Sequence, residues 1–438
     1  MANSPILKTL NEAAHIITSK ERIKELFHLP LYSNAFYLML STAISAILGF
    51  LFWIIAAKFY TEAEVGLASA IIASICLLSS LGYLGLNFSL IRFLPHAEKP
   101  QELINTCFTL SGLVSVVLAG IFIAGLQWWS PALAFIKESA VFSLAFIAFV
   151  LLWTLAYFID VAFIARRRAG FALSKNIIIS LLRIPLPILL VALFHTFGIV
   201  ASWAIAVIVG VAVSLFLFLP KVQNAYKPVP ALKLNLIKGV WRYSGANYLA
   251  QLFSIAPSTL FPIMVVNLLG AESNAYFYIA WMVASLLSAI PLAVSQSLFA
   301  EGSHFEEKLG ENVGKSLKFT FLLLIPVVIL FVFGGKWLLL AFGQTYSSHA
   351  LSLLRILAIS SLPLGINCIY TSILRVTNRI KELAGIWAFV ALATLITSYL
   401  ILPATGIIGI GYVWLVAHSL VTFYILGFAR PWRHVVQR

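Results

Sequence analysis

The chain has 438 residues, of which 61% are hydrophobic and 10% are charged, and its mean hydropathy is +1.00. Soluble domains average about 45 to 50% apolar and about 25% charged residues, so this composition excludes a soluble globular protein and indicates a polytopic membrane protein. The net charge of +14 does not indicate a nucleic-acid partner, because the lysines and arginines concentrate in alternate loops.

The first segment, residues 1–32, lacks the short basic region, apolar core and small-residue cleavage site of a signal peptide. In this segment the apolar residues Ile6, Leu10, Ala14 and Ile17 recur at helical spacing, with lysines and arginines nearby. This pattern fits a helix lying on the cytoplasmic membrane surface or, equally, a solvated tail.

Twelve long apolar runs follow. A transmembrane helix needs about 20 such residues, and backbone groups in lipid must pair within the chain, so helices are expected rather than the short alternating strands of a barrel. The sequence therefore predicts an all-α integral membrane protein with spans near 33–59, 65–93, 105–127, 140–164, 177–197, 199–219, 244–269, 275–299, 317–340, 349–374, 384–402 and 406–429.

The two halves of the chain repeat each other weakly. Tyr32-Ser33-x-Ala35-x-Tyr37-Leu38 matches Tyr243-Ser244-x-Ala246-x-Tyr248-Leu249 at a spacing of 211 residues. At a spacing of 208, Gly198-Ile199 matches Gly406-Ile407, and the end of the fourth helix matches that of the tenth, which aligns Arg167 with Arg375. These matches predict a duplicated six-helix unit.

The longest polar interruption, residues 220–243, separates the two predicted units. We therefore expect an N-terminal bundle over 33–219, a cytoplasmic linker over 220–243, a C-terminal bundle over 244–429 and a cytoplasmic tail over 430–438. Because six is an even number, both units enter the membrane in the same direction, as parallel repeats about a pseudo-twofold axis along the membrane normal.

Basic residues assign the sides of the membrane. With the N-terminus inside, the successive cytoplasmic segments hold 4, 2, 4, 5, 3, 3 and 3 lysines and arginines, whereas the outer side holds Lys58, Lys137 and Lys336. Cytoplasmic loops carry the excess of lysine and arginine, so a multi-pass cell-membrane protein with both termini in the cytoplasm is predicted.

Polar stripes mark equivalent helices of the two units. On the first helix, Asn34, Tyr37, Ser41, Ser45 and Gly49 recur at steps of three and four, and on the seventh Ser244, Asn247, Gln251, Ser254 and Ser258 do the same. The second and eighth helices add Asn87 and Gln296. Such stripes fit tight interhelical packing, or a water-filled cavity that binds sugar hydroxyls. The five amides, Asn34, Asn87, Asn247, Gln251 and Gln296, are candidate substrate ligands.

Charged residues inside the predicted spans are expensive, at about 2.5 to 3.5 kcal/mol each at mid-membrane, and usually functional. Arg92, Arg183 and Arg355 are cations, and Asp160 is the only comparable carboxylate. This excess of cations favours an anionic substrate. Alternatively Arg92, or Arg183 near the start of its predicted helix, snorkels to an interface, and Arg355 pairs with an outer-side carbonyl. Asp160 is the candidate site for a coupling H⁺ or Na⁺.

No catalytic motif or metal-spaced cluster is present in the sequence, so neither an enzyme nor a cofactor is predicted. His418 and the three cysteines, Cys76, Cys107 and Cys368, are interpreted as packing residues. Pro257, Pro262 and Pro291 remove backbone donors in the seventh and eighth helices, where bending during transport is expected.

Two passages carry a family resemblance: YTEAEVGLASAIIASICLLSSLGYLGLNFSLIRFLP at 60–95 and LLLAFGQTYSSHALSLLRILAISSLP at 338–363. They resemble the Wzx-type oligosaccharide flippases, whose superfamily also holds MATE-type multidrug antiporters and lipid II flippases. Lipid II flippases carry arginines within the first helix and extra helices beyond twelve, which this chain lacks; its first helix has only Lys58, at the end.

The resemblance implies a V-shaped pair of bundles, with a cavity lined by the first, second, seventh and eighth helices. It implies that a polyprenyl-(pyro)phosphate-linked oligosaccharide moves from the inner to the outer leaflet. We expect Arg92 and Arg355 to attract its (pyro)phosphate, with Arg183 as a further candidate ligand. Membrane lipids and glycan polymerase or ligase machinery are the further partners implied. A MATE-like antiporter of drugs or organic cations, with Asp160 as its ion site, is the alternative. A non-transporting scaffold or polymerase subunit is a third interpretation.

Overall fold

The computed structural model describes residues 30–194, 196–224, 226–237, 240–304 and 309–429, and every regular element in these ranges is a helix. The N-terminal segment and the C-terminal tail predicted from the sequence lie almost entirely outside them. Eleven described helices are long and apolar enough to cross a membrane. Two shorter helices in sequence, α9 and α10, supply the twelfth span, so the predicted all-α membrane protein is confirmed.

The N-terminal bundle contains main helices and several short pieces. Its main elements are α3 (Pro30–Phe59), α4 (Glu62–Gly82), α5 (Leu86–Phe93), α6 (Pro100–Ala124), α8 (Ala140–Ala165), α9 (Ala169–Leu182), α10 (Leu186–Phe194) and α11 (Thr196–Val213). The short pieces are η1 (Leu94–His96), α7 (Leu126–Trp129), η2 (Pro131–Glu138), a π-helical turn η3 (Ser214–Phe218) and α12 (Leu219–Val222).

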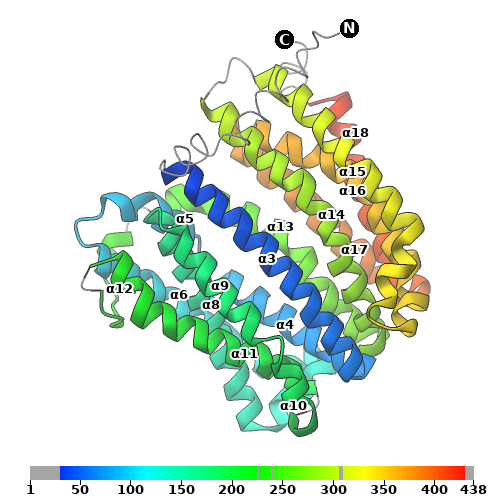
Figure 1. Cartoon of the computed structure of the whole chain (residues 1–438), viewed down its shortest axis with the longest axis horizontal. Helices are drawn as coiled ribbons and strands as arrows, with labels where there is room; N and C mark the ends of the chain where they lie inside the picture. The colour runs from blue at the N-terminus through cyan, green and yellow to red at the C-terminus, as the bar shows by residue number, and fades with distance from the viewer. Residues whose placement is uncertain (1–29, 195, 225, 238–239, 305–308, 430–438) are drawn as a thin grey trace, which may run out of the picture.

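The C-terminal bundle follows a linker that contains one short helix, η4 (Leu234–Ile237). Its helices are α13 (Val240–Leu269), α14 (Ala271–His304), α15 (Leu309–Leu340), α16 (Gln344–Val376), α17 (Ile380–Thr405) and α18 (Ile407–Gly427). Figure 1 shows the helices of both bundles running in a common diagonal direction, with α3 lying across the front between them. Helices α13 and α14 continue through Pro257, Pro262 and Pro291, so bending at these positions stays a prediction.

Two spans of the N-terminal bundle are broken. The second ends its first part at Gly82, turns through Leu84 and Gly85, which both have positive φ angles, and resumes as α5. The fifth is interrupted between α9 and α10, where Pro185 supplies no amide hydrogen. This span begins at Ala169 rather than at 177, so Arg183 follows the 14 residues of α9 instead of lying near a helix start.

From the end of the fourth span onward, the internal repeat holds at a spacing of 211 residues. Adding 211 to the ends of the fifth span, 169 and 194, gives 380 and 405, the ends of α17. The turns that precede the fifth span and α17 also match. Arg167 and Asn378 both have φ +54°. The backbone amides of Arg168 and Arg379 each donate to the carbonyl oxygen five residues earlier. The spacing of 208 that aligned Arg167 with Arg375 and Gly198 with Gly406 was therefore wrong by three residues.

The hydrophobic core forms three clusters. One lies within the N-terminal bundle around Phe158 and Phe163, and another lies within the C-terminal bundle around Ile373. The third joins the bundles, with Phe52 of α3 and Phe277 of α14 both fully buried in it. Lipid tails are as apolar as these side chains, so close packing and polar contacts, rather than exclusion of water, hold the helices together.

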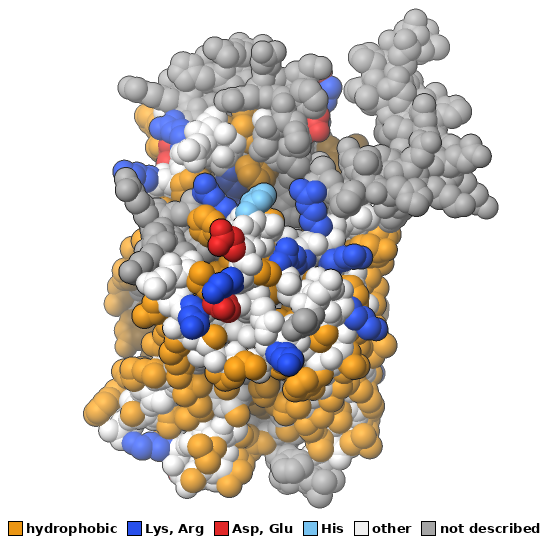
Figure 2. All heavy atoms as spheres, turned by 90° about the vertical axis from the view of Figure 1, so that its left-hand side faces the viewer, with side chains coloured by type: hydrophobic (Ala, Val, Ile, Leu, Met, Phe, Trp, Pro, Cys, Tyr) orange, Lys and Arg blue, Asp and Glu red, His pale blue; other side chains and the backbone are white. Residues whose placement is uncertain are grey.

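Charged side chains gather at one end of the molecule. Figure 2 views the side on which α5 and α12 lie, where Lys and Arg side chains collect on the face and hydrophobic side chains cover most of the surface beyond them. Exposed aromatic residues such as Trp128, Phe333 and Trp337 belong to the apolar surface. We refer to the end that carries α5 and the α8–α9 turn as the basic end, which the sequence predicts to be cytoplasmic, and to the opposite end as the far end.

Candidate functional site: the boundary between the bundles

At the basic end, the bundles meet where α5 approaches α13. The hydroxyls of Ser89 and Ser244 lie 2.7 Å apart, and the Tyr248 hydroxyl donates to the Leu81 carbonyl at 2.7 Å. Gly85 permits this approach, because an added Cβ there would lie 3.1 Å from the Cβ atoms of Ser244 and Tyr248. The break in the second span thus positions α5 against the C-terminal bundle.

Further from the basic end, two of the amides predicted as substrate ligands, Asn87 and Gln251, lie beside the hydroxyl of Tyr157. The Asn87 amide nitrogen donates to the Tyr157 hydroxyl at 3.1 Å and to the Gln251 Oε1 at 3.2 Å. Gln251 Nε2 lies 3.4 Å from the same hydroxyl, and the Tyr157 ring stacks on Tyr83 at a centroid distance of 4.2 Å. Asn87 Oδ1 is buried and has no partner among the described residues. The cluster joins α5 and α8 to α13 across the boundary.

One turn further along α8 lies an ion pair that the sequence analysis missed. Lys175 Nζ lies 2.7 Å from Asp160 Oδ2 and donates to the Ala156 carbonyl at 2.6 Å, and the Lys175 side chain is only 2% exposed. Lys175 was counted among the loop residues because the fifth helix was predicted to begin at 177. Its burial within α9 corrects that count. A lysine inside a predicted loop carries no sequence signal for an internal partner.

The polar stripe of the first helix packs against α9. Asn34 Oδ1 accepts a hydrogen bond from the Ala169 amide at 2.7 Å, and Asn176 Nδ2 donates to the Ser41 hydroxyl at 3.1 Å. Gly49 lies beside the Arg183 guanidinium. These contacts are the interhelical packing that the sequence left open as an alternative, and they place Asn34 within the N-terminal bundle.

Arg183 is the buried cation of the boundary. Its side chain is 8% exposed, and its guanidinium carbon lies 5.5 Å from the Phe52 ring centroid and 5.0 Å from that of Trp203. Phe52 belongs to the core cluster that joins the bundles, as does Tyr278 of α14, whose ring lies 4.7 Å from that of Trp53. Both bundles therefore contribute to its surroundings.

The hydrogen-bonding capacity of Arg183 is largely unused. Its Nη2 is 3.5 Å from the Ser45 carbonyl, its Nε has no partner, and no carboxylate within the described ranges pairs with it. At about 1.5 Å per residue, the 14 residues of α9 place it about 21 Å from the start of that helix, too deep for the snorkelling that the sequence allowed. A buried arginine with open donors is suited to an anion.

The other two arginines lie apart from this position. Arg92 is exposed at the end of α5, with its guanidinium 5.7 Å from the Phe93 ring centroid. Arg355 is exposed on α16, and its Nε donates to the Val332 carbonyl of α15 at 2.8 Å, which is the local carbonyl pairing considered from the sequence. No contact within the described ranges brings the three arginines together. Asn247 is half-buried on α13 and Gln296 is exposed on α14.

At the far end, the bundles meet through α4 and α14. Gly66 approaches Ala271 so closely that an added Cβ would lie 1.8 Å from the Ala271 carbonyl oxygen. Asn274, fully buried, donates to the Gly66 carbonyl at 2.7 Å and to the Ser69 hydroxyl at 3.1 Å. The sequence analysis missed Asn274, although an amide near the start of an apolar helix was a visible signal. The boundary is thus in contact at both ends.

The C-terminal bundle also contains polar groups between its own helices. A cavity of about 60 Å³ is lined by Trp281, Ala284, Ser285, Ser288, Leu357, Ser360, Ser361, Leu364 and Trp414. Beside it, His418 is fully buried, accepts from Asn367 Nδ2 at 3.0 Å through Nδ1, and packs against Trp414. His418 is therefore a packed residue, as predicted.

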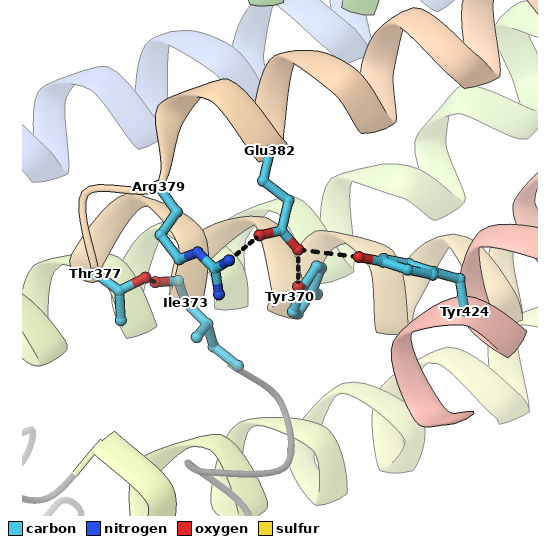
Figure 3. A network of polar contacts seen from close by, with 6 residues as sticks. All are labelled: Tyr370, Ile373, Thr377, Arg379, Glu382 and Tyr424. Atoms are coloured by element: carbon cyan, nitrogen blue, oxygen red, sulfur yellow. Dashed lines mark hydrogen bonds and ion pairs between the residues drawn. The ribbon is translucent and has the colours of Figure 1, made fainter. Parts of the chain in front are cut away.

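A second polar network lies at the turn between α16 and α17. Figure 3 shows Glu382 accepting hydrogen bonds from Tyr370 and Tyr424 and pairing with Arg379 at 3.0 Å, which ties α16, α17 and α18 together. In the described residues no group of three or more His, Cys, Asp or Glu side chains could hold a metal ion. The charged groups of this network are thus paired locally, whereas Arg183 faces the boundary.

Two bundles of six spans each, with a buried cation at their boundary, define a polytopic membrane protein with the architecture of a transporter. Residues 31–300 match the family described as Polysaccharide biosynthesis protein, and residues 246–400 match the MatE family. Because the first match covers more than half of the sequence, the chain belongs to the polysaccharide biosynthesis protein family. This places it in the MOP superfamily and confirms the resemblance to Wzx-type flippases.

A putative O-antigen transporter of Shigella flexneri is 26% identical over 154 residues, a match that covers 34% of this chain and 37% of that relative. The matched region thus spans little more than a third of the relative's length. Among solved structures, the fold is similar to that of the lipid II flippase MurJ in an inward closed conformation. That likeness has a TM-score of 0.70 and 15% identity, over 92% of this chain and 90% of that one.

Multidrug transporters share the same fold. The MATE multidrug transporter DinF-BH has a TM-score of 0.65 and 18% identity, over 95% of this chain and 97% of that one. A MOP superfamily transporter from Pyrococcus furiosus has a TM-score of 0.59 and 15% identity, over 93% and 97%. At these identities the likeness defines the architecture alone.

Proposed function

We propose that this protein is a flippase that moves a polyprenyl-(pyro)phosphate-linked oligosaccharide from the cytoplasmic to the outer leaflet of the cell membrane by alternating access. The observation that carries the proposal is Arg183, a buried cation at the bundle boundary without a carboxylate partner in the described residues. A phosphate group would fill the open donors of its guanidinium. The family match to polysaccharide biosynthesis proteins supports the same substrate class.

The remaining groups of the boundary suit a glycan. Asn87 and Gln251 present amides from opposite bundles, and amides donate to and accept from sugar hydroxyls. The lipid tail would stay in the bilayer, beside the exposed apolar surface of α3. Alternation would open one end of the boundary while the other stays closed, which requires the α5–α13 and α4–α14 contacts to break in turn.

A MATE-like exchange of small organic cations is the second candidate, and the match of residues 246–400 to the MatE family favours it. Such an antiporter needs a carboxylate that is free to bind H⁺ or Na⁺. Asp160 is paired with Lys175 instead, and Arg183 would repel a cationic substrate. These two features favour the flippase.

The test uses a strain without the chromosomal gene, in which variants are expressed and surface glycan is quantified. A hydrogen bond to a charged group is worth about 1.5 to 3 kcal/mol, so Arg183→Gln should lower the export rate about 10- to 100-fold. Arg183→Lys, which keeps the charge but loses the fork of donors, should fall between Arg183→Gln and the wild type. Arg355→Gln is the matched control, because Arg355 bonds only a neighbouring carbonyl.

Normal glycan export by Arg183→Gln, with equal protein in the membrane, would refute this assignment. The double variant Arg92→Ala/Arg355→Ala tests the other two arginines in the same assay, and full export by it would remove them from the site. Lost resistance to organic cations on gene deletion, with unchanged surface glycan, would favour the antiporter.

A further inference from the structure

The ion pair of α8 and α9 has the composition of a monovalent cation site. Lys175 Nζ is held by a carboxylate oxygen, Asp160 Oδ2, at 2.7 Å and by a backbone carbonyl oxygen, Ala156 O, at 2.6 Å. Carboxylate and carbonyl oxygens are ligands that alkali and other hard cations take in proteins. Here the ammonium fills the place of such an ion.

Among the described residues, no charge other than that of Lys175 balances Asp160. The titratable groups that face it are Lys175 from α9, Tyr157 on its own helix and Tyr83 from the break between α4 and α5. Neither phenol carries a positive charge in any protonation state. Asp160 Oδ1 is buried and has no hydrogen-bond partner among the described residues, so one ligand position of the carboxylate is open.

We infer that Lys175 is a built-in substitute for a coupling cation, so that the conformational cycle of this protein does not require Na⁺ or H⁺ at Asp160. The ammonium stays bound through its own side chain and cannot be exchanged with solution. The sequence analysis assigned ion coupling to Asp160; the geometry assigns that carboxylate a permanent partner instead. The inference concerns the ion requirement of the carboxylate and holds whatever substrate the boundary carries.

The charge of this pair is connected to the bundle boundary. Tyr157 lies one turn before Asp160 on α8, and its hydroxyl binds Asn87 and lies near Gln251. A net charge at Asp160 would act directly on that hydroxyl and on the boundary beyond it. Because breaking a buried pair leaves an uncompensated charge, removal of Lys175 should make a mobile cation necessary.

The test measures thermal unfolding of the purified full-length protein in detergent, with NaCl, KCl or choline chloride at equal ionic strength. The Tm of the wild type should be the same in all three salts. The Tm of Lys175→Met should rise by several degrees in NaCl or KCl relative to choline chloride, because a cation that binds only the folded state stabilises it. If a proton takes the site instead, the Tm of Lys175→Met relative to the wild type should rise at mildly acid pH.

Two control variants isolate the site. Asp160→Asn/Lys175→Met removes both charges and should lose the cation and pH responses together. Lys315→Met breaks an ion pair with Glu311 whose side chains are 65% and 62% exposed, and it should respond like the wild type. These outcomes do not depend on glycan transport, so they are separable from the proposed function.

The inference would be overturned by a Na⁺- or K⁺-dependent rise in the wild-type Tm that Asp160→Asn/Lys175→Met lacks, since Asp160 would then bind a mobile cation despite Lys175. A Lys175→Met protein that responds to neither cations nor protons would overturn it as well. Should Lys175→Met fail to fold, Lys175→Gln serves in its place, and the comparison of the wild type with the double variant still decides.

Discussion

Closure of the far end depends on the absence of a side chain at Gly66. In Gly66→Ala the new Cβ would lie 1.8 Å from the Ala271 carbonyl oxygen and 2.7 Å from its carbon. Both are backbone atoms, so no rotamer change relieves the overlap. Ordinary contact begins at 3.4 Å, and the difference from 1.8 Å is 1.6 Å, the distance by which α4 and α14 would have to separate there.

The cost of that separation follows from the contacts that it breaks. Asn274 would lose its hydrogen bonds to the Gly66 carbonyl and the Ser69 hydroxyl, worth about 0.5 to 1.5 kcal/mol each. Forcing an extra methyl group into a packed interface costs about 1 to 3 kcal/mol more. The sum is about 2 to 6 kcal/mol, so the population closed at the far end should fall at least about 30-fold relative to conformations open there.

Distances between spin labels at Lys137 and Glu272, both exposed near the far end on opposite bundles, would report the change. Gly66→Ala should populate longer distances than the wild type in a background without native cysteines. Gly120→Ala is the matched control, because nothing lies within 4 Å of its added Cβ. Identical distance distributions for Gly66→Ala, Gly120→Ala and the wild type would refute the reasoning.

Two further changes test the basic end and the far-end turn. Gly85 has φ +72° and lies against α13, so Gly85→Ala should open the basic end and expose a reporter cysteine there to a soluble thiol reagent. Gly245→Ala, with open space around its added Cβ, should leave that cysteine protected. Equal labelling of the two variants would contradict this prediction. Tyr60→Phe should lower stability at neutral pH by about 1 to 2 kcal/mol, because Tyr60 donates to the Pro187 carbonyl at 2.7 Å. Burial and, to a lesser degree, the charge of Glu64 raise the pKa of Tyr60 from 10.0 to about 12. The neutral phenol therefore contributes its full stability below pH 10, and this contribution is lost as the pH rises through about 12. The Tm gap between wild type and variant should therefore shrink in strongly alkaline buffer, and a gap that grows there would refute the assignment.

Helix number and type were predictable because each span must satisfy its length and its backbone groups within lipid. The breaks in the second and fifth spans were not predicted as breaks, although each contains a turn-forming residue: Gly85 in one and Pro185 in the other. Apolar runs hide such breaks, because hydropathy measures composition and not backbone geometry. The three-residue error in the repeat spacing had the same origin, since short matches recur by chance in apolar sequence.

The sequence predicted several residues of the candidate site correctly, but it predicted fewer of the contacts that these residues make. Asn87 and Gln251 were expected on facing helices and do meet. The polar stripe containing Asn34 packs against α9 instead. The spacing of polar residues shows that they share one face of a helix, but it does not show which helix packs against that face. Lys175 escaped notice because a lysine near a predicted loop normally anchors the membrane interface; only the position of α9 shows that it is internal.

The spacing of 211 residues between the later spans of the two units also bears on the origin of this chain. A six-span ancestor that inserts in one direction could pair with a second copy about the same axis, and such a symmetric dimer would carry every charge twice. In the fused chain the positions 211 residues after Asp160, Lys175 and Arg183 are Thr371, Ile386 and Thr394, all uncharged. Tandem fusion of the copies thus permits a single charged pair and a single buried arginine, whereas a homodimer would carry two of each.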